Sequence, residues 1–138
     1  MGETIKRLMR LFALALIFLL AGCGLKTGLI VYDDLSPEPQ LASISHQVIG
    51  NAVQIQLSII GGSDTVVYQI DRAKVDPDCK CVNDWLRYYE SSPSTQRHDL
   101  KRNIKLQHVD ETYAFRVRVM DSLGRKSDWS KVFQVKAE

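Results

Sequence analysis

The chain has 138 residues, of which 18 are basic and 16 acidic, so its formal net charge at pH 7 is +2. Three of the 18 basic residues and one of the 16 acidic residues lie in residues 1–22, so residues 23–138 hold 15 of each and are neutral. A neutral chain has no electrostatic footprint for nucleic acid, and this length is that of one domain. Composition therefore excludes a nucleic-acid partner and indicates a single domain.

The first 22 residues have the pattern of a secretory signal. Three basic residues precede an uncharged stretch that runs from Leu11 to Leu25. As a helix this stretch would be about 22 Å long, which is shorter than the roughly 30 Å hydrocarbon core of a bilayer. A basic start, a short apolar stretch and a small-residue end are typical of a signal peptide that is removed. We predict that residues 1–22 are such a peptide; the alternative is a short transmembrane helix.

The segment Leu20-Ala21-Gly22-Cys23 resembles the lipobox of bacterial lipoproteins. In that family the cysteine thiol receives a diacylglycerol, the chain is cut before the cysteine, and the new amino group is acylated. The resemblance implies a palmitate-type lipid anchor on Cys23, whose acyl chains each contribute about 0.8 kcal/mol per buried methylene. Gly24 resembles the sorting pattern for the outer membrane of a bacterium with two membranes, which implies a cell-envelope protein anchored in that membrane. We expect it on the periplasmic face; the alternative is the cell surface.

Residues 23–40 contain glycines, an acidic pair and two prolines without a sustained period. Such a composition predicts a flexible tether between the lipidated cysteine and the domain. The opening CGLKTGLIVY (23–32) resembles small outer-membrane lipoproteins that associate with the lipopolysaccharide-export machinery. This second resemblance implies an alternative function, as an accessory lipoprotein of outer-membrane assembly.

From residue 41 onward the hydrophobic period is two. In VQIQLSI (53–59) apolar residues occupy every second position and polar residues lie between them. The alternation recurs in four further segments, at 66–70, 100–106, 113–119 and 133–135. Alternation of this kind predicts half-buried antiparallel strands. Short strands separated by turns indicate an all-β sandwich over residues 41–138.

The segment 111–135 resembles the last two strands of a fibronectin type III domain. Tyr113 stands where that family has its tyrosine corner, in which a buried tyrosine bonds the preceding backbone through its hydroxyl. The resemblance covers roughly residues 41–137 and implies an immunoglobulin-like, fibronectin type III-like antiparallel β-sandwich.

The segment SDWS (127–130) resembles half of the Trp-Ser-x-Trp-Ser box of cytokine-receptor modules. In those modules the tryptophan stacks among arginines of the neighbouring strand. Arg116 and Arg118 are predicted to face outward, so the resemblance implies a structural cation–π stack of Trp129 over their guanidinium groups. The alternative is that Trp129 is a binding residue.

Once Cys23 is assigned to lipid, Cys79 and Cys81 remain as a pair in an oxidising compartment. Residues two apart on a strand lie about 6.6 Å from each other, near the upper limit for a disulfide, but Pro77 predicts a turn that brings them closer. We predict a structural disulfide or idle thiols. A redox-active dithiol and half of a metal site are the alternatives, and a metal would need two more ligands.

Two segments offer a candidate binding surface. In WLRYYE (85–90), a strand would place Trp85 and Tyr89 on one face, where exposed aromatic rings could meet a protein or a sugar. The alternative is that these rings cover the domain itself. Arg125 and Lys126 lie in the turn before the last strand, at an end where sandwich domains commonly bind.

The sequence contains no serine-nucleophile motif, paired carboxylates or phosphate-binding loop, so we expect no enzymatic activity, cofactor or metal. It predicts a monomeric, lipid-anchored binding module for an envelope protein or a glycan. The alternatives are an envelope thiol-redox protein that uses Cys79 and Cys81, and the accessory role in outer-membrane assembly.

Overall fold

The computed structural model describes residues 2–3, 6–7, 36–108 and 110–136 of the chain. The chain divides into two compact units, Met1–Asp33 and Asp34–Glu138, and every strand of the described residues belongs to the second. None of the helices in the described ranges is long and apolar enough to cross a membrane. Cys23 and most of the predicted tether lie outside the described residues.

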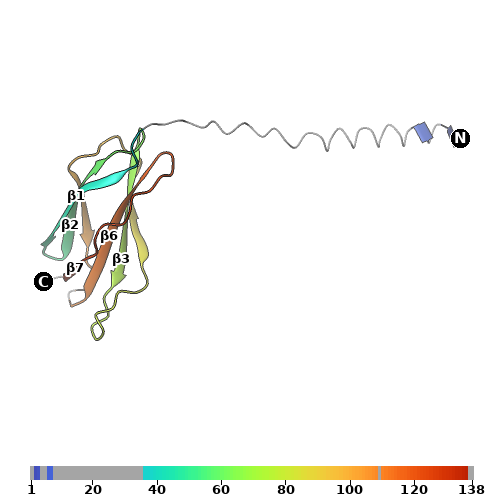
Figure 1. The fold of residues 1–138 in the computed structure, drawn as a ribbon. Helices are drawn as coiled ribbons and strands as arrows, with labels where there is room; N and C mark the ends of the chain where they lie inside the picture. Colours follow the sequence, from blue (N-terminus) through green and yellow to red (C-terminus); the bar gives the residue numbers. More distant parts are fainter. Residues whose placement is uncertain (1, 4–5, 8–35, 109, 137–138) are drawn as a thin grey trace. The chain divides into compact units, whose positions relative to one another are not determined.

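The second unit is built from two antiparallel sheets (Figure 1). Its strands are β1 (Gln40–Ile49), β2 (Ala52–Ile60), β3 (Val66–Lys74), β4 (Leu86–Glu90), β5 (Leu100–Lys105), β6 (Thr112–Asp121) and β7 (Phe133–Lys136). One sheet has the order β1-β2-β5 and the other the order β4-β3-β6-β7. The predicted antiparallel sandwich is confirmed, and this arrangement is consistent with an immunoglobulin-like or fibronectin type III-like fold.

The core lies between the two sheets and follows the alternation seen in the sequence. Ile55 and Leu57 of β2 point into it from one sheet, and Phe115 and Val117 of β6 point into it from the other. All four side chains are buried. Burying a side chain of this size contributes about 1.5–3 kcal/mol, so these positions fix which face of each strand is covered.

The domain begins earlier than the sequence predicted. β1 starts at Gln40, and Pro39 before it is already buried. Gly61, in the turn after β2, has a φ of +69° and lies so close to this segment that a Cβ atom would be 2.3 Å from the carbonyl oxygen of Glu38. Only glycine allows this approach. Residues 36–40, assigned to the tether from the sequence, are therefore part of the domain.

Candidate functional site

The outer face of the four-stranded sheet carries a stack of tryptophan and arginine side chains. The Cζ atom of Arg116 lies 4.4 Å from the ring centroid of Trp85 and 4.2 Å from that of Trp129. The Cζ atom of Arg118 lies 4.4 Å from the Trp129 centroid. Both guanidinium groups are therefore in contact with the indole of Trp129. Each contact contributes about 0.5–1 kcal/mol at an exposed site.

A buried carboxylate holds the arginines of this face in place. The side chain of Asp71 on β3 is only 7% exposed. Its Oδ1 accepts a hydrogen bond from Nε of Arg87 at 2.6 Å, and its Oδ2 accepts one from Nη2 of Arg116 at 3.1 Å. A buried, doubly paired carboxylate fixes the planes of both guanidinium groups.

The hydrogen bonds continue along the same face as far as Arg118. Nη1 of Arg87 donates to Glu90 at 3.0 Å, and Nε2 of Gln69 donates to the same carboxylate oxygen at 2.6 Å. The amide oxygen of Gln69 then accepts a hydrogen bond from Nε of Arg118 at 2.7 Å. The outer face is thus a connected polar layer rather than a set of independent surface side chains.

The two serines of the SDWS segment join it to β6 ahead of the start of β7. The hydroxyls of Ser127 and Ser130 accept hydrogen bonds from the backbone N–H groups of Val119 and Val117, both at 2.9 Å. The backbone N–H groups of the serines return the bonds, to the carbonyls of Val119 at 2.9 Å and Val117 at 2.7 Å. This pairing holds Trp129 over the arginines.

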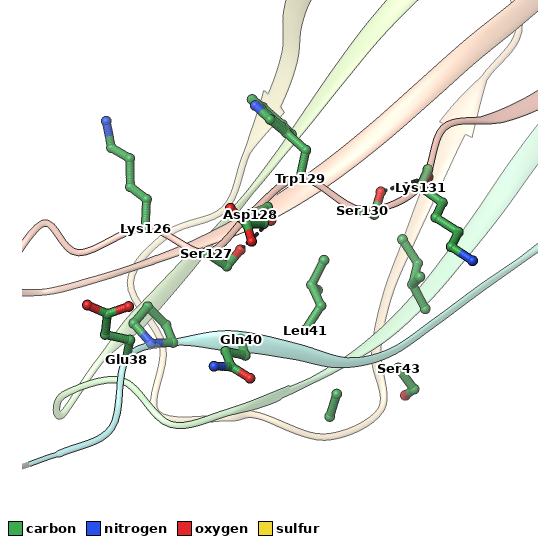
Figure 2. A pocket seen from close by; sticks show the side chains of 13 residues that line it. Glu38, Gln40, Leu41, Ser43, Lys126, Ser127, Asp128, Trp129, Ser130 and Lys131 are labelled. Atoms are coloured by element: carbon green, nitrogen blue, oxygen red, sulfur yellow. Dashed lines mark hydrogen bonds between the residues drawn. The ribbon is translucent and has the colours of Figure 1, made fainter.

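A groove of about 610 Å³ separates β1 from the segment 126–131 (Figure 2). Leu41 of β1 points into it, while Lys126 and Trp129 point away from β1. Apart from its pairing with β2, the backbone of β1 makes no hydrogen bond within the described part of the chain. An unpaired strand edge of this kind can accept an extended segment of a partner.

Trp85 and Tyr89 lie on opposite faces, which corrects the prediction that they share one. Tyr89 pairs with Ile70 and packs against the core, with its ring 5.7 Å from that of Tyr68. Trp85 precedes β4 and lies on the outer face against Arg116. The pairing of β3 with β4 shifts by one residue after Ile70, so the alternation along WLRYYE is interrupted. Only Trp85 of the two belongs to the outer face.

Arg125, predicted as a contact residue, takes part in hydrogen bonds of the domain itself. Its Nε donates to Oδ2 of Asp121 at 2.8 Å. Its Nη1 and Nη2 donate to the carbonyl oxygen and the hydroxyl of Ser36, both at 2.9 Å. Arg125 thereby fastens the start of the domain to the loop that follows β6. Lys126, the next residue, is exposed.

Cys79 and Cys81 are joined by a disulfide in the exposed loop between β3 and β4, with their Cα atoms 5.2 Å apart. Oδ1 of Asp76 accepts hydrogen bonds from the backbone N–H groups of Asp78 and Cys79. The backbone hydrogen bonds from Cys79 and Asp78 lower the pKa of Asp76. The turn that Asp76 stabilises brings the two cysteines closer together than an extended strand would.

Tyr113 is buried, as predicted, but its hydroxyl has a different acceptor. It donates to Oε2 of the Glu111 side chain at 2.7 Å instead of to the backbone. Glu111 also pairs with Lys74. Burial is the main cause that raises the pKa of Tyr113, and the bond to Glu111 raises it further. The prediction of a tyrosine corner is therefore wrong about the acceptor of the tyrosine hydroxyl.

The described residues contain no group of three or more histidine, cysteine or acidic side chains that could hold a metal ion. Comparison of the chain with protein-family models and with curated proteins gave no match. Neither comparison assigns the chain to a family, so its function has to be inferred from the geometry of the domain itself.

Proposed function

We propose that this chain is a lipid-anchored module of a bacterial cell envelope that binds an envelope protein or a glycan and has no catalytic activity. The observation that carries this proposal is the outer face of the four-stranded sheet, where Trp85, Trp129 and three arginines are held rigidly by Asp71 and Gln69. Tryptophan and arginine are the residue types enriched at the energetic centres of protein interfaces. Holding them rigidly lowers the entropy lost when a partner binds.

Crosslinking in intact cells tests the binding function. A photo-crosslinking residue in place of Asp128, which is exposed and precedes Trp129 in the chain, is expected to capture a specific envelope protein or glycan. The same residue in place of Lys105, exposed on the other sheet, serves as the control. If neither position captures a specific envelope molecule, or both capture the same set of abundant proteins, the proposal is wrong.

The anchor is tested by changing Cys23 to serine. Labelled palmitate is expected to enter the wild-type protein and to be absent from Cys23→Ser, because serine lacks the thiol that takes the lipid. The variant is also expected to leave the membrane fraction, since loss of the acyl chains removes the main source of membrane affinity. Replacing Cys79 and Cys81 with serine should leave labelling unchanged. Incorporation of palmitate into Cys23→Ser would contradict the lipobox interpretation.

The thiol-redox alternative rests on the exposed disulfide between Cys79 and Cys81. Asp76 and Asp78 precede the first cysteine, and negative charges nearby oppose formation of the thiolate that attacks a substrate disulfide. The hydrogen bonds that Asp76 accepts from the loop backbone support a structural role for the disulfide. We therefore favour the binding function.

A further inference from the structure

Arg118 differs from the other arginines of the outer face in having no carboxylate partner among the described residues. Arg116 and Arg87 share Asp71, and Arg87 also pairs with Glu90. The hydrogen bond that Arg118 makes is with the neutral amide oxygen of Gln69. The three arginines and two acids of this face therefore leave one positive charge uncompensated, and that charge lies at Arg118.

The two Nη groups of Arg118 reach solvent. They donate no hydrogen bond within the described part of the chain. Among the described residues, one buried side-chain nitrogen or oxygen atom has no hydrogen-bond partner, and it is Nη1 of Arg72. The Nη atoms of Arg118, which also have no partner, are therefore not buried. The bond from Nε to Gln69 and the contact with Trp129 fix the plane of the guanidinium. A guanidinium held in this way offers a two-pronged donor already set for an oxyanion.

Lys126 adds a second positive charge on the same face. It lies opposite Met120 across an isolated bridge, and Met120 is two residues from Arg118 along β6. Diagonal neighbours on a sheet lie about 7–8 Å apart, within the combined reach of these two long side chains. Lys126 and Trp129 point to the same side, away from β1 (Figure 2). Asp128 is exposed and forms no ion pair with either cation in the described residues.

We propose that Arg118 and Lys126 bind a carboxylate of an acidic segment in the protein partner, an inference that rests on the binding function proposed above. A carboxylate matches the two free Nη groups with parallel hydrogen bonds. A glycan fits less well, because sugar rings stack on the open face of an aromatic ring, and the indole of Trp129 is already in contact with two guanidinium groups. The charge balance thus selects an acidic protein segment.

A labelled peptide of twelve glutamates, with a twelve-glutamine peptide as its control, tests this inference on the full-length lipoprotein in detergent at low ionic strength. The glutamate peptide is expected to bind, and Arg118→Gln is expected to weaken its binding about tenfold, as loss of a charge-assisted pair predicts. Lys105→Gln removes one positive charge from the other sheet and should leave binding unchanged. Arg118→Lys keeps the charge but loses the two-pronged donor, so it should bind more weakly than wild type and more tightly than Arg118→Gln. Thermal unfolding of each variant shows that it is folded.

Equal binding of the glutamate peptide by wild type and Arg118→Gln would overturn the inference. So would tighter binding of a phosphorylated oligosaccharide than of the peptide, since the site would then take a glycan. Crosslinking from Asp128, which leaves Arg118 and Lys126 in place, separates this inference from the proposed function. A partner captured equally by wild type and Arg118→Gln removes the role of Arg118 and leaves the binding function standing, whereas failure to capture any partner removes the binding function itself.

Discussion

Replacing Asp121 with asparagine is expected to lower the free energy of unfolding by about 2–3 kcal/mol. The side chain of Asp121 is 0% exposed. Its Oδ1 accepts from the backbone N–H groups of Leu123 and Arg125, and its Oδ2 accepts from the Arg125 side chain and from the backbone of Ser63. Asparagine would replace one of these two acceptor oxygens with an amide NH₂ group. That group cannot accept a hydrogen bond, so buried donors would be left without an acceptor. Arg125 would also lose the carboxylate that positions it on Ser36.

The effect of this substitution should depend on pH. Burial raises the pKa of Asp121, but the hydrogen bonds from the Arg125 side chain and backbone and from Ser63 outweigh it and hold the pKa below its ordinary value of 3.8. A pKa lowered by folding gives stability that is complete above the unfolded-state pKa and is lost as the pH falls through the folded-state pKa. Urea unfolding should therefore show the full difference between wild type and Asp121→Asn at pH 7 and a smaller one below about pH 4.

Asp128→Asn is the matched control, because Asp128 lies in the segment that follows Asp121 but is exposed. Its free energy of unfolding should stay within about 0.5 kcal/mol of wild type. A loss as large as that of Asp121→Asn, or a difference that does not change with pH, would show that the buried carboxylate does not stabilise this loop.

Strands β2 and β6 could be predicted because every second residue of each is buried. Ile55 and Leu57 alternate with glutamine and serine, and Phe115 and Val117 are separated by an arginine, so the sequence itself contains the two faces. β1 is an edge strand whose side chains are mostly exposed, and its apolar residues do not alternate. A strand with neither face fully covered leaves no periodic signal. The sequence predicts β1 only through the general β character of the chain after residue 41.

Only the part of the candidate site whose residues lie close together in the sequence could be predicted. Arg116, Arg118 and Trp129 lie within one hairpin-like segment, and the resemblance of SDWS placed them together. Asp71 on β3 and Trp85 just before β4 reach the same face through the pairing of β3 with β4 and β6. Alternation predicts on which face of a strand a residue lies. It does not predict the register of strand pairing, which decides which residue distant in the sequence lies beside it. The one-residue shift in the pairing of β3 with β4 then places Trp85 and Tyr89 on opposite faces of the sheet.

Asp71→Asn is the second substitution with a large expected effect, because it removes the one buried carboxylate beneath the described tryptophan–arginine stack. Arg87 and Arg116 would both lose their shared partner. Removing one member of a buried ion pair commonly costs 3–5 kcal/mol, but these arginines are 35% and 26% exposed, and water would partly replace the carboxylate. We therefore expect a loss of about 2–3 kcal/mol in urea unfolding at pH 7.

The same face provides the control that separates burial from charge. Glu90 also pairs with Arg87, but its side chain is 47% exposed, so Glu90→Gln should cost at most about 1 kcal/mol. Freeing Arg116 should loosen its contacts with Trp85 and Trp129, and the near-ultraviolet circular dichroism of the tryptophans should weaken in Asp71→Asn but not in Glu90→Gln. Equal losses from the two substitutions would mean that the net charge of the face, and not the buried carboxylate, keeps the arginines in position. The proposed binding surface would then lack the structural source of its rigidity.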